Sequence, residues 1–164
     1  MVIQKSSISK AILFCLFIVL TFIPCDGSIF KKDARPIKIK QFLTQKYSDS
    51  PLIGHEQEIV YCADKFKLDY RLYMAIAGAE STFGRRYPKW SRNLTGYGIY
   101  GGKIPGFKSI YENIYKTHEL IAMSRYYRKY RKTGEIKDLV HVYKGVPPYG
   151  HYIRTVKWVF KELE

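Results

Sequence analysis

The segment from Tyr70 to Phe83 places the strongest constraint on how this 164-residue chain folds. Its helical positions are apolar on every face: Leu72, Tyr73, Met74, Ala75, Ile76, Ala77 and Ala79. A helix of this kind is stable only when neighbouring elements cover all its sides. The segment therefore predicts a central buried helix inside a compact domain. Asp69 precedes it at the position expected for an N-cap.

Further helices are predicted on both sides of this segment. From His55 to Leu68, apolar residues recur at helical spacing between charged ones, which indicates an amphipathic helix. A capping box at 109–112 (Ser-Ile-Tyr-Glu) should start a long helix that runs to about Lys132 and stops at Gly134. Two shorter helical patterns follow, at 136–143 and 153–163. The pattern predicts a mainly α fold.

Residues 84–108 interrupt this helical pattern with a concentration of glycine and proline. Such composition is typical of turns and loops, because glycine adopts backbone angles that other residues avoid. We expect a long loop or a small β-hairpin here. The glycines Gly96, Gly98, Gly101 and Gly102 would also permit a ligand to approach the backbone closely.

The N-terminal residues have the order of a secretory signal. Lys5 and Lys10 precede an apolar run of 13 residues, 11–23, which is shorter than the roughly 20 residues that span a bilayer. Small residues suit cleavage between Gly27 and Ser28. We expect a signal peptide at 1–27, a basic linker or arm at 28–50 and one domain at 51–164. An uncleaved membrane anchor is the alternative.

Charge points to anionic partners. The chain has 28 Lys and Arg residues and 14 Asp and Glu residues. Residues 1–27 hold Lys5, Lys10 and Asp26. Without them, 26 basic and 13 acidic residues remain, which gives a net charge of +13. Such an excess attracts polyanions. For an exported protein these are anionic wall polymers and membrane surfaces rather than nucleic acid. One basic set reads as a solvated face or as a site for wall anions: Arg125, Arg128, Lys129, Arg131 and Lys132.

Glu80 is the unusual charged residue, because it ends the apolar helix. Burial and the negative end of the helix dipole both raise the pKa of a carboxyl group. A carboxyl that stays protonated near neutral pH suits a general acid that protonates a leaving oxygen. The alternative is a frayed helix end with Glu80 in solvent, paired to Arg85 or Arg86.

Three segments carry a resemblance to a known family. Residues 75–84 (Ala-Ile-Ala-Gly-Ala-Glu-Ser-Thr-Phe-Gly) and 93–102 (Asn-Leu-Thr-Gly-Tyr-Gly-Ile-Tyr-Gly-Gly) resemble motifs of bacterial endo-β-N-acetylglucosaminidases. The elements Tyr143-Lys144-Gly145 and Tyr152-Ile153 are similar to those of the related lytic transglycosylases, although Lys144 stands where that family has Asn. The likeness covers about residues 55–163.

The resemblance implies a lysozyme-like α+β fold in which a cleft separates the Glu80 helix from the glycine-rich segment. Glu80 would protonate the glycosidic oxygen of a peptidoglycan strand at an N-acetylglucosamine linkage. The resemblance and the sugar-packing ability of tyrosine suggest a substrate-binding set: Ser81, Asn93, Gly96, Tyr97, Gly98, Tyr100 and Tyr143. Neither a cofactor nor a metal is expected, since the four histidines lack the spacing of a zinc site. We expect a monomer in the periplasm or cell envelope, or secreted.

A second catalytic carboxylate is not evident. Glu112, Glu119 and Asp138 lie on predicted polar helix faces, where we expect them to be solvated. Glycosidases normally hold a second carboxyl group about 5–9.5 Å from the first. Without it, the N-acetyl group of the substrate would stabilise the developing cation. Hydrolysis and transglycosylation both remain open, as does a non-catalytic, cationic wall-binding protein.

Overall fold

The computed structural model describes residues 33–99 and 101–164. They form α-helices and two short 3-10 helices: α2 (Arg35–Lys46), α3 (Glu56–Phe66), α4 (Arg71–Ser81), η1 (Lys89–Ser91), α5 (Ile110–Met123), η2 (Arg125–Tyr127), α6 (Arg128–Thr133), α7 (Ile136–Lys144) and α8 (Gly150–Glu162). The fold is mainly α, as predicted. No strand occurs in these residues, so the β-hairpin considered for 84–108 is not confirmed. The predicted signal segment lies outside them.

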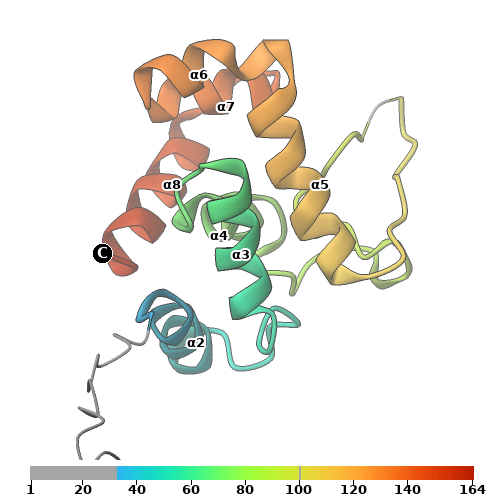
Figure 1. Cartoon of the computed structure of the whole chain (residues 1–164). Helices are drawn as coiled ribbons and strands as arrows, with labels where there is room; N and C mark the ends of the chain where they lie inside the picture. The colour runs from blue at the N-terminus through green and yellow to red at the C-terminus, as the bar shows by residue number, and fades with distance from the viewer. Residues whose placement is uncertain (1–32, 100) are drawn as a thin grey trace, which may run out of the picture. The chain divides into compact units, whose positions relative to one another are not determined.

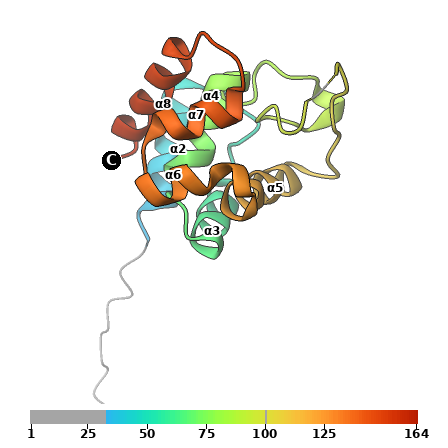
Figure 2. The same ribbon diagram turned by 90° about the horizontal axis from the view of Figure 1, so that it is seen from above.

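Helix α4 forms the centre of the domain, as its apolar sequence predicts. Its residues 72–77 are buried, and it packs chiefly against α8, while α3 packs on α5. Figures 1 and 2 show α4 surrounded by these helices. The N-cap of α4 is Tyr70 rather than the predicted Asp69, one residue earlier, although the Asp69 carboxylate accepts the backbone N–H of Arg71 at 2.9 Å. Among the described helices, none is long and apolar enough to cross a membrane.

The expectation of a basic linker at 28–50 is wrong for the residues that the structure describes. Arg35–Lys46 is helix α2, whose side chains Ile39, Phe42 and Leu43 are buried in the main core. These three positions follow the i, i+3, i+4 spacing of an amphipathic helix, which the many lysines between them obscure. Pro36 looked like a loop residue, but it lies in the first helical turn, where no backbone N–H is needed.

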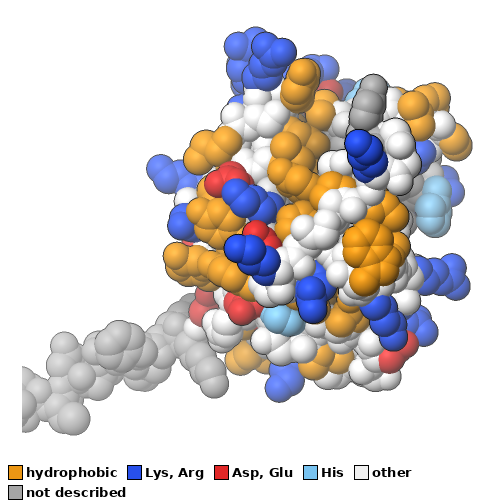
Figure 3. Space-filling model, turned by 90° about the vertical axis from the view of Figure 1, so that its right-hand side faces the viewer, with side chains coloured by type: hydrophobic (Ala, Val, Ile, Leu, Met, Phe, Trp, Pro, Cys, Tyr) orange, Lys and Arg blue, Asp and Glu red, His pale blue; other side chains and the backbone are white. Residues whose placement is uncertain are grey.

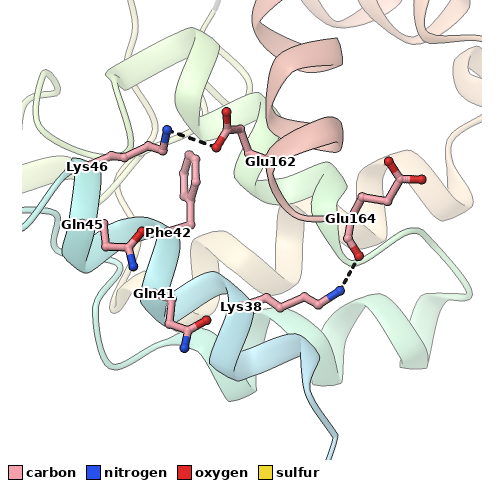
Figure 4. A pocket seen from close by; sticks show the side chains of 7 residues that line it. All are labelled: Lys38, Gln41, Phe42, Gln45, Lys46, Glu162 and Glu164. Carbon is pink, nitrogen blue, oxygen red and sulfur yellow. Dashed lines mark hydrogen bonds and ion pairs between the residues drawn. The ribbon is translucent and has the colours of Figure 1, made fainter.

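Polar contacts fix α2 against the end of α8. Lys46 pairs with Glu162 at 3.1 Å, and Lys38 donates to the carbonyl of Glu164. Figure 4 shows these residues around a small hollow of about 200 Å³. The compact unit therefore begins at Asp33 rather than near Pro51.

The predicted long helix from 109 to about 132 is interrupted. Helix α5 ends at Met123, where Ser124 adopts an extended backbone (ψ 136°), and the chain turns into η2 and α6, which ends at Gly134 as predicted. Arg131 stabilises this corner by donating to the carbonyls of Ile121 (2.7 Å) and Ser124 (2.8 Å). The capping box also forms only in part: Ser109 accepts from the N–H of Glu112 at 3.0 Å, while Glu112 accepts from Lys108.

A buried network of polar groups ties the glycine-rich segment to the helices. The Asn113 side chain of α5 accepts from Tyr73 of α4 at 2.9 Å and donates to Thr95 at 3.1 Å. Thr95 also bonds Thr117 of α5 at 2.9 Å, and all four side chains are at most 1% exposed. Buried hydrogen-bonded networks resist rearrangement, because breaking one leaves unpaired polar groups. The segment around Thr95 is therefore held in place.

Candidate functional site

A cleft of about 370 Å³ opens at the end of α4, between the glycine-rich segment and the α7–α8 connection. It is lined by Ala79, Glu80, Gly96, Ile99, Tyr143, Lys144, His151 and Tyr152. Glu80 is its one carboxylate among the described residues, and Lys144 and His151 are basic. The fold thus brings together residues from three segments that lie up to 73 positions apart in the sequence.

The local fold at the end of α4 explains how Glu80 reaches the cleft. After Ser81 the chain turns sharply through Thr82 (φ 53°), Phe83 (φ 58°) and Gly84 (φ 78°). The N–H of Phe83 returns to the carbonyl of Ala77 at 3.0 Å, which closes the helix. Because the helix ends one residue beyond Glu80, this carboxylate projects at the rim rather than into the core.

Glu80 is exposed to solvent at the cleft mouth, and neighbouring protein atoms shield its carboxyl group only in part. Burial raises its pKa above the ordinary value, as the sequence predicted. The Tyr152 hydroxyl and the Lys144 ammonium group partly offset this effect, since both favour the ionised form. The Tyr152 hydroxyl does not complete a hydrogen bond: it is buried and has no partner of suitable geometry among the described residues. The net effect is a pKa raised above the ordinary value for a glutamic acid, the direction that a general acid needs.

Gly96 lies directly beside Glu80 in the cleft wall. A Cβ atom added to Gly96 would lie 2.8 Å from Oε2 of Glu80, and the backbone there is left-handed (φ +65°). Both facts require glycine, because a side chain would displace the carboxyl group and strain the backbone. The Tyr143 hydroxyl donates to the carbonyl of Thr95 at 2.9 Å, which fixes the neighbouring wall.

The structure brings Gly96 and Tyr143 of the predicted binding set beside Glu80. Ser81 and Asn93 are buried instead, with structural partners: Ser81 donates to the carbonyl of Leu94 at 2.6 Å, and Asn93 donates to that of Tyr97 at 2.9 Å. Both residues therefore hold the backbone of the glycine-rich segment and do not themselves line the cleft.

The remaining members of the predicted set lie away from the carboxyl group or cannot be placed. The ring of Tyr97 packs edge-on against Phe107, and Tyr97 does not line the cleft. Gly98 does not line it either, and a Cβ atom added there would contact only Pro105. Tyr100 lies outside the described residues.

Sequence reasoning left Lys144, His151 and Tyr152 out of the candidate site. Tyr152 and Lys144 stood within the motifs that carried the resemblance, which was a signal that the site extended to them. His151 had no such signal, because its place in the cleft depends on how α8 packs on α4.

The other carboxylates considered for catalysis lie elsewhere. Glu119 pairs with Lys116 at 2.7 Å on the surface of α5, and none of Glu112, Glu119 and Asp138 lines the cleft. The expectation of a solvated Asp138 is wrong, since its side chain is 6% exposed and pairs with Lys129 at 2.8 Å. No cluster of three or more His, Cys, Asp or Glu residues suited to a metal occurs in the described part of the chain.

Comparisons with protein-family models, curated proteins and solved structures give no match to this chain. The functional assignment therefore depends on the cleft and on the sequence motifs.

Proposed function

We propose that this protein cleaves β-1,4 glycosidic bonds of peptidoglycan glycan strands at N-acetylglucosamine, with Glu80 as the general acid. The observation that carries the proposal is a single carboxyl group with a raised pKa in a solvent-open cleft. Protonation of the leaving oxygen requires a carboxyl group that still holds its proton when the substrate binds. The chain would act outside the cytoplasm, after export directed by residues 1–27.

The arrangement of the cleft supports a lysozyme-like architecture. The end of the Glu80 helix and Gly96 of the fixed glycine-rich segment lie beside each other in its wall, which agrees with the pairing of these two segments in the resemblance to glucosaminidases. Ile99 and Tyr143 offer apolar surface against which a sugar ring can pack.

The same cleft also favours a second candidate reaction. Because no other carboxylate lines it among the described residues, the N-acetyl group of the substrate would stabilise the developing cation. Attack by water gives hydrolysis, whereas attack by the 6-hydroxyl of the sugar gives a 1,6-anhydro end. The second outcome would make the protein a lytic transglycosylase.

Mass spectrometry of digested peptidoglycan separates these reactions. Hydrolysis at N-acetylglucosamine should leave that sugar at the reducing end. Transglycosylation would break the muramic acid linkage instead and leave an anhydro-muramoyl end, lighter by one water than the end that hydrolysis of the same linkage gives. Intact strands after prolonged digestion, with protein bound to the wall, would instead identify a non-catalytic, cationic wall-binding protein.

A further inference from the structure

The cleft wall facing Glu80 is positively charged. Lys144, the last residue of α7, and His151, in the first turn of α8, both line it. The Lys144 ammonium group donates to the carbonyl of Val146 at 2.9 Å, which positions it and leaves two of its three N–H groups for a ligand. Neither residue forms an ion pair with a carboxylate within the described residues.

The start of α8 adds further positive potential at the same place. Its first turn holds no acidic residue, and no side chain caps it. The backbone N–H groups of Gly150, His151 and Tyr152 have no acceptor in the described part of the chain. Helix N-termini favour negative charge. This turn carries His151 instead, and Arg154 follows it. Nη1 of Arg154 lies 3.5 Å from the position that a Cβ atom on Gly150 would take. Arg154 thus adds positive charge at the positive end of the helix, where a bound anion would be stabilised by both.

A buried hydroxyl group beside Glu80 also lines the cleft. The Tyr152 side chain lines the cleft, is only 5% exposed, and has a hydroxyl group without a partner in the described residues. Unpaired buried polar groups are costly, so native proteins seldom retain them without a ligand or a functional reason.

We propose that Lys144, His151 and the N-terminal turn of α8 form a subsite for a carboxylate carried by the substrate. This inference rests on the proposed function and makes it more specific: the bound strand would present an acidic substituent, such as the lactyl or peptide carboxylate of muramic acid, to this wall. A neutral polymer of N-acetylglucosamine would leave the subsite empty. Lys144 stands where the resembling family has Asn, so this charge distinguishes the present chain.

The subsite would couple substrate binding to catalysis. The titratable groups around Glu80 are Tyr143 and Lys144 from α7 and His151 and Tyr152 from α8; the described cleft residues Gly96 and Ile99 carry none. Lys144 favours the ionised form of Glu80, which a general acid must avoid. A bound carboxylate would neutralise Lys144 and keep the proton on Glu80.

The test compares one glycan strand in two forms, with its carboxylates free or converted to amides. Lys144→Gln should lower kcat/KM about tenfold on the free form, mainly through KM, and leave the amidated form nearly unchanged. Lys40→Gln on α2, which removes an exposed positive charge from a helix that does not line the cleft, is the matched control and should affect both forms equally. Equal losses on both forms in Lys144→Gln, with unchanged melting temperature, would overturn the subsite.

A binding measurement keeps the subsite testable without turnover. In calorimetric titration, Glu80→Gln should bind a muramoyl disaccharide more tightly than its methyl ester, and Glu80→Gln combined with Lys144→Gln should lose that preference. Preference without any glycan cleavage by the unmodified protein would reject the proposed function and retain the subsite. No preference would reject the subsite even if cleavage occurs.

Discussion

Glu80 combines two demands at one residue, since it must be accessible to a substrate and surrounded by enough protein to retain its proton. At the end of α4 the carboxyl group is open to the cleft, and its partial burial raises its pKa. Lys144 and Tyr152 act in the opposite direction on its pKa. The proton on Glu80 is therefore sensitive to what binds beside it.

The raised pKa of Glu80 predicts a pH-dependent effect on stability. A carboxyl whose pKa is higher in the folded than in the unfolded protein destabilises the fold once pH exceeds both values, because the ionised form is disfavoured in the native state. Glu80→Gln should therefore raise the melting temperature at pH 8, and the gain should shrink towards pH 4. Calorimetry across this range measures it. A gain that is the same at every pH would show that ionisation of Glu80 is not involved.

Gly96 and Gly98 provide a matched pair of substitutions. Both have left-handed backbones (φ +65° and +61°), so alanine at either position should lower the free energy of unfolding by about 1–2 kcal/mol. Only the methyl group of alanine at position 96 would contact Glu80. Gly96→Ala should lower turnover about 100-fold, since small displacements of a catalytic group are costly, while Gly98→Ala should change it less than about twofold. Similar activity in the two variants would remove Gly96 from the cleft wall.

Among the secondary-structure elements, helix α2 is the one that the sequence pattern did not predict. Its composition resembles that of a solvated arm, and yet one stripe of three apolar residues anchors it to the core.

Two substitutions in α2 test this anchoring. Phe42→Ala should lower the free energy of unfolding by about 3–5 kcal/mol, because the ring is 4% exposed and contacts Phe83 with centroids 5.2 Å apart. Ile37→Ala, at a position that is 42% exposed, should change it by about 0.5 kcal/mol or less. Denaturant titration compares them. Equal, small effects would indicate that α2 is only loosely attached.

The sequence predicts elements with strong periodicity and misses those whose structure depends on distant partners. Helices α3, α4, α7 and α8 follow from their apolar spacing. The break at Ser124 does not, because it depends on Arg131 returning to cap α5. At the site, Glu80 and Gly96 follow from local motifs. His151 reaches the cleft only through packing between helices that are far apart in the sequence.

At the scale of the whole molecule, the described domain carries a basic corner at η2 and α6. Lys129 is paired with Asp138, and Arg131 binds backbone carbonyls, so the predicted basic set is only partly free. Arg125, Arg128 and Lys132 have no carboxylate partner among the described residues. Figure 3 shows Lys and Arg side chains gathered at the upper edge of the face it displays. We propose that this corner docks on anionic wall polymer.

Salt dependence tests this docking. The Debye length is about 10 Å at 0.1 M salt, so binding through exposed charges should weaken steeply as salt rises. Turnover of whole sacculi should therefore fall across a salt series, while turnover of a short neutral glycan should change little. A parallel fall for both substrates would place the effect in the cleft or in folding, and the docking surface would be rejected.

The most direct measurement of the central claim is the release of soluble muropeptides from purified sacculi by the unmodified protein and by Glu80→Gln. The variant keeps the size and polarity of the side chain and removes its proton-transfer function. The rate should fall about 10²–10⁴-fold in Glu80→Gln, while binding to sacculi is retained. Release at an undiminished rate by Glu80→Gln would contradict the assignment of Glu80 as the general acid.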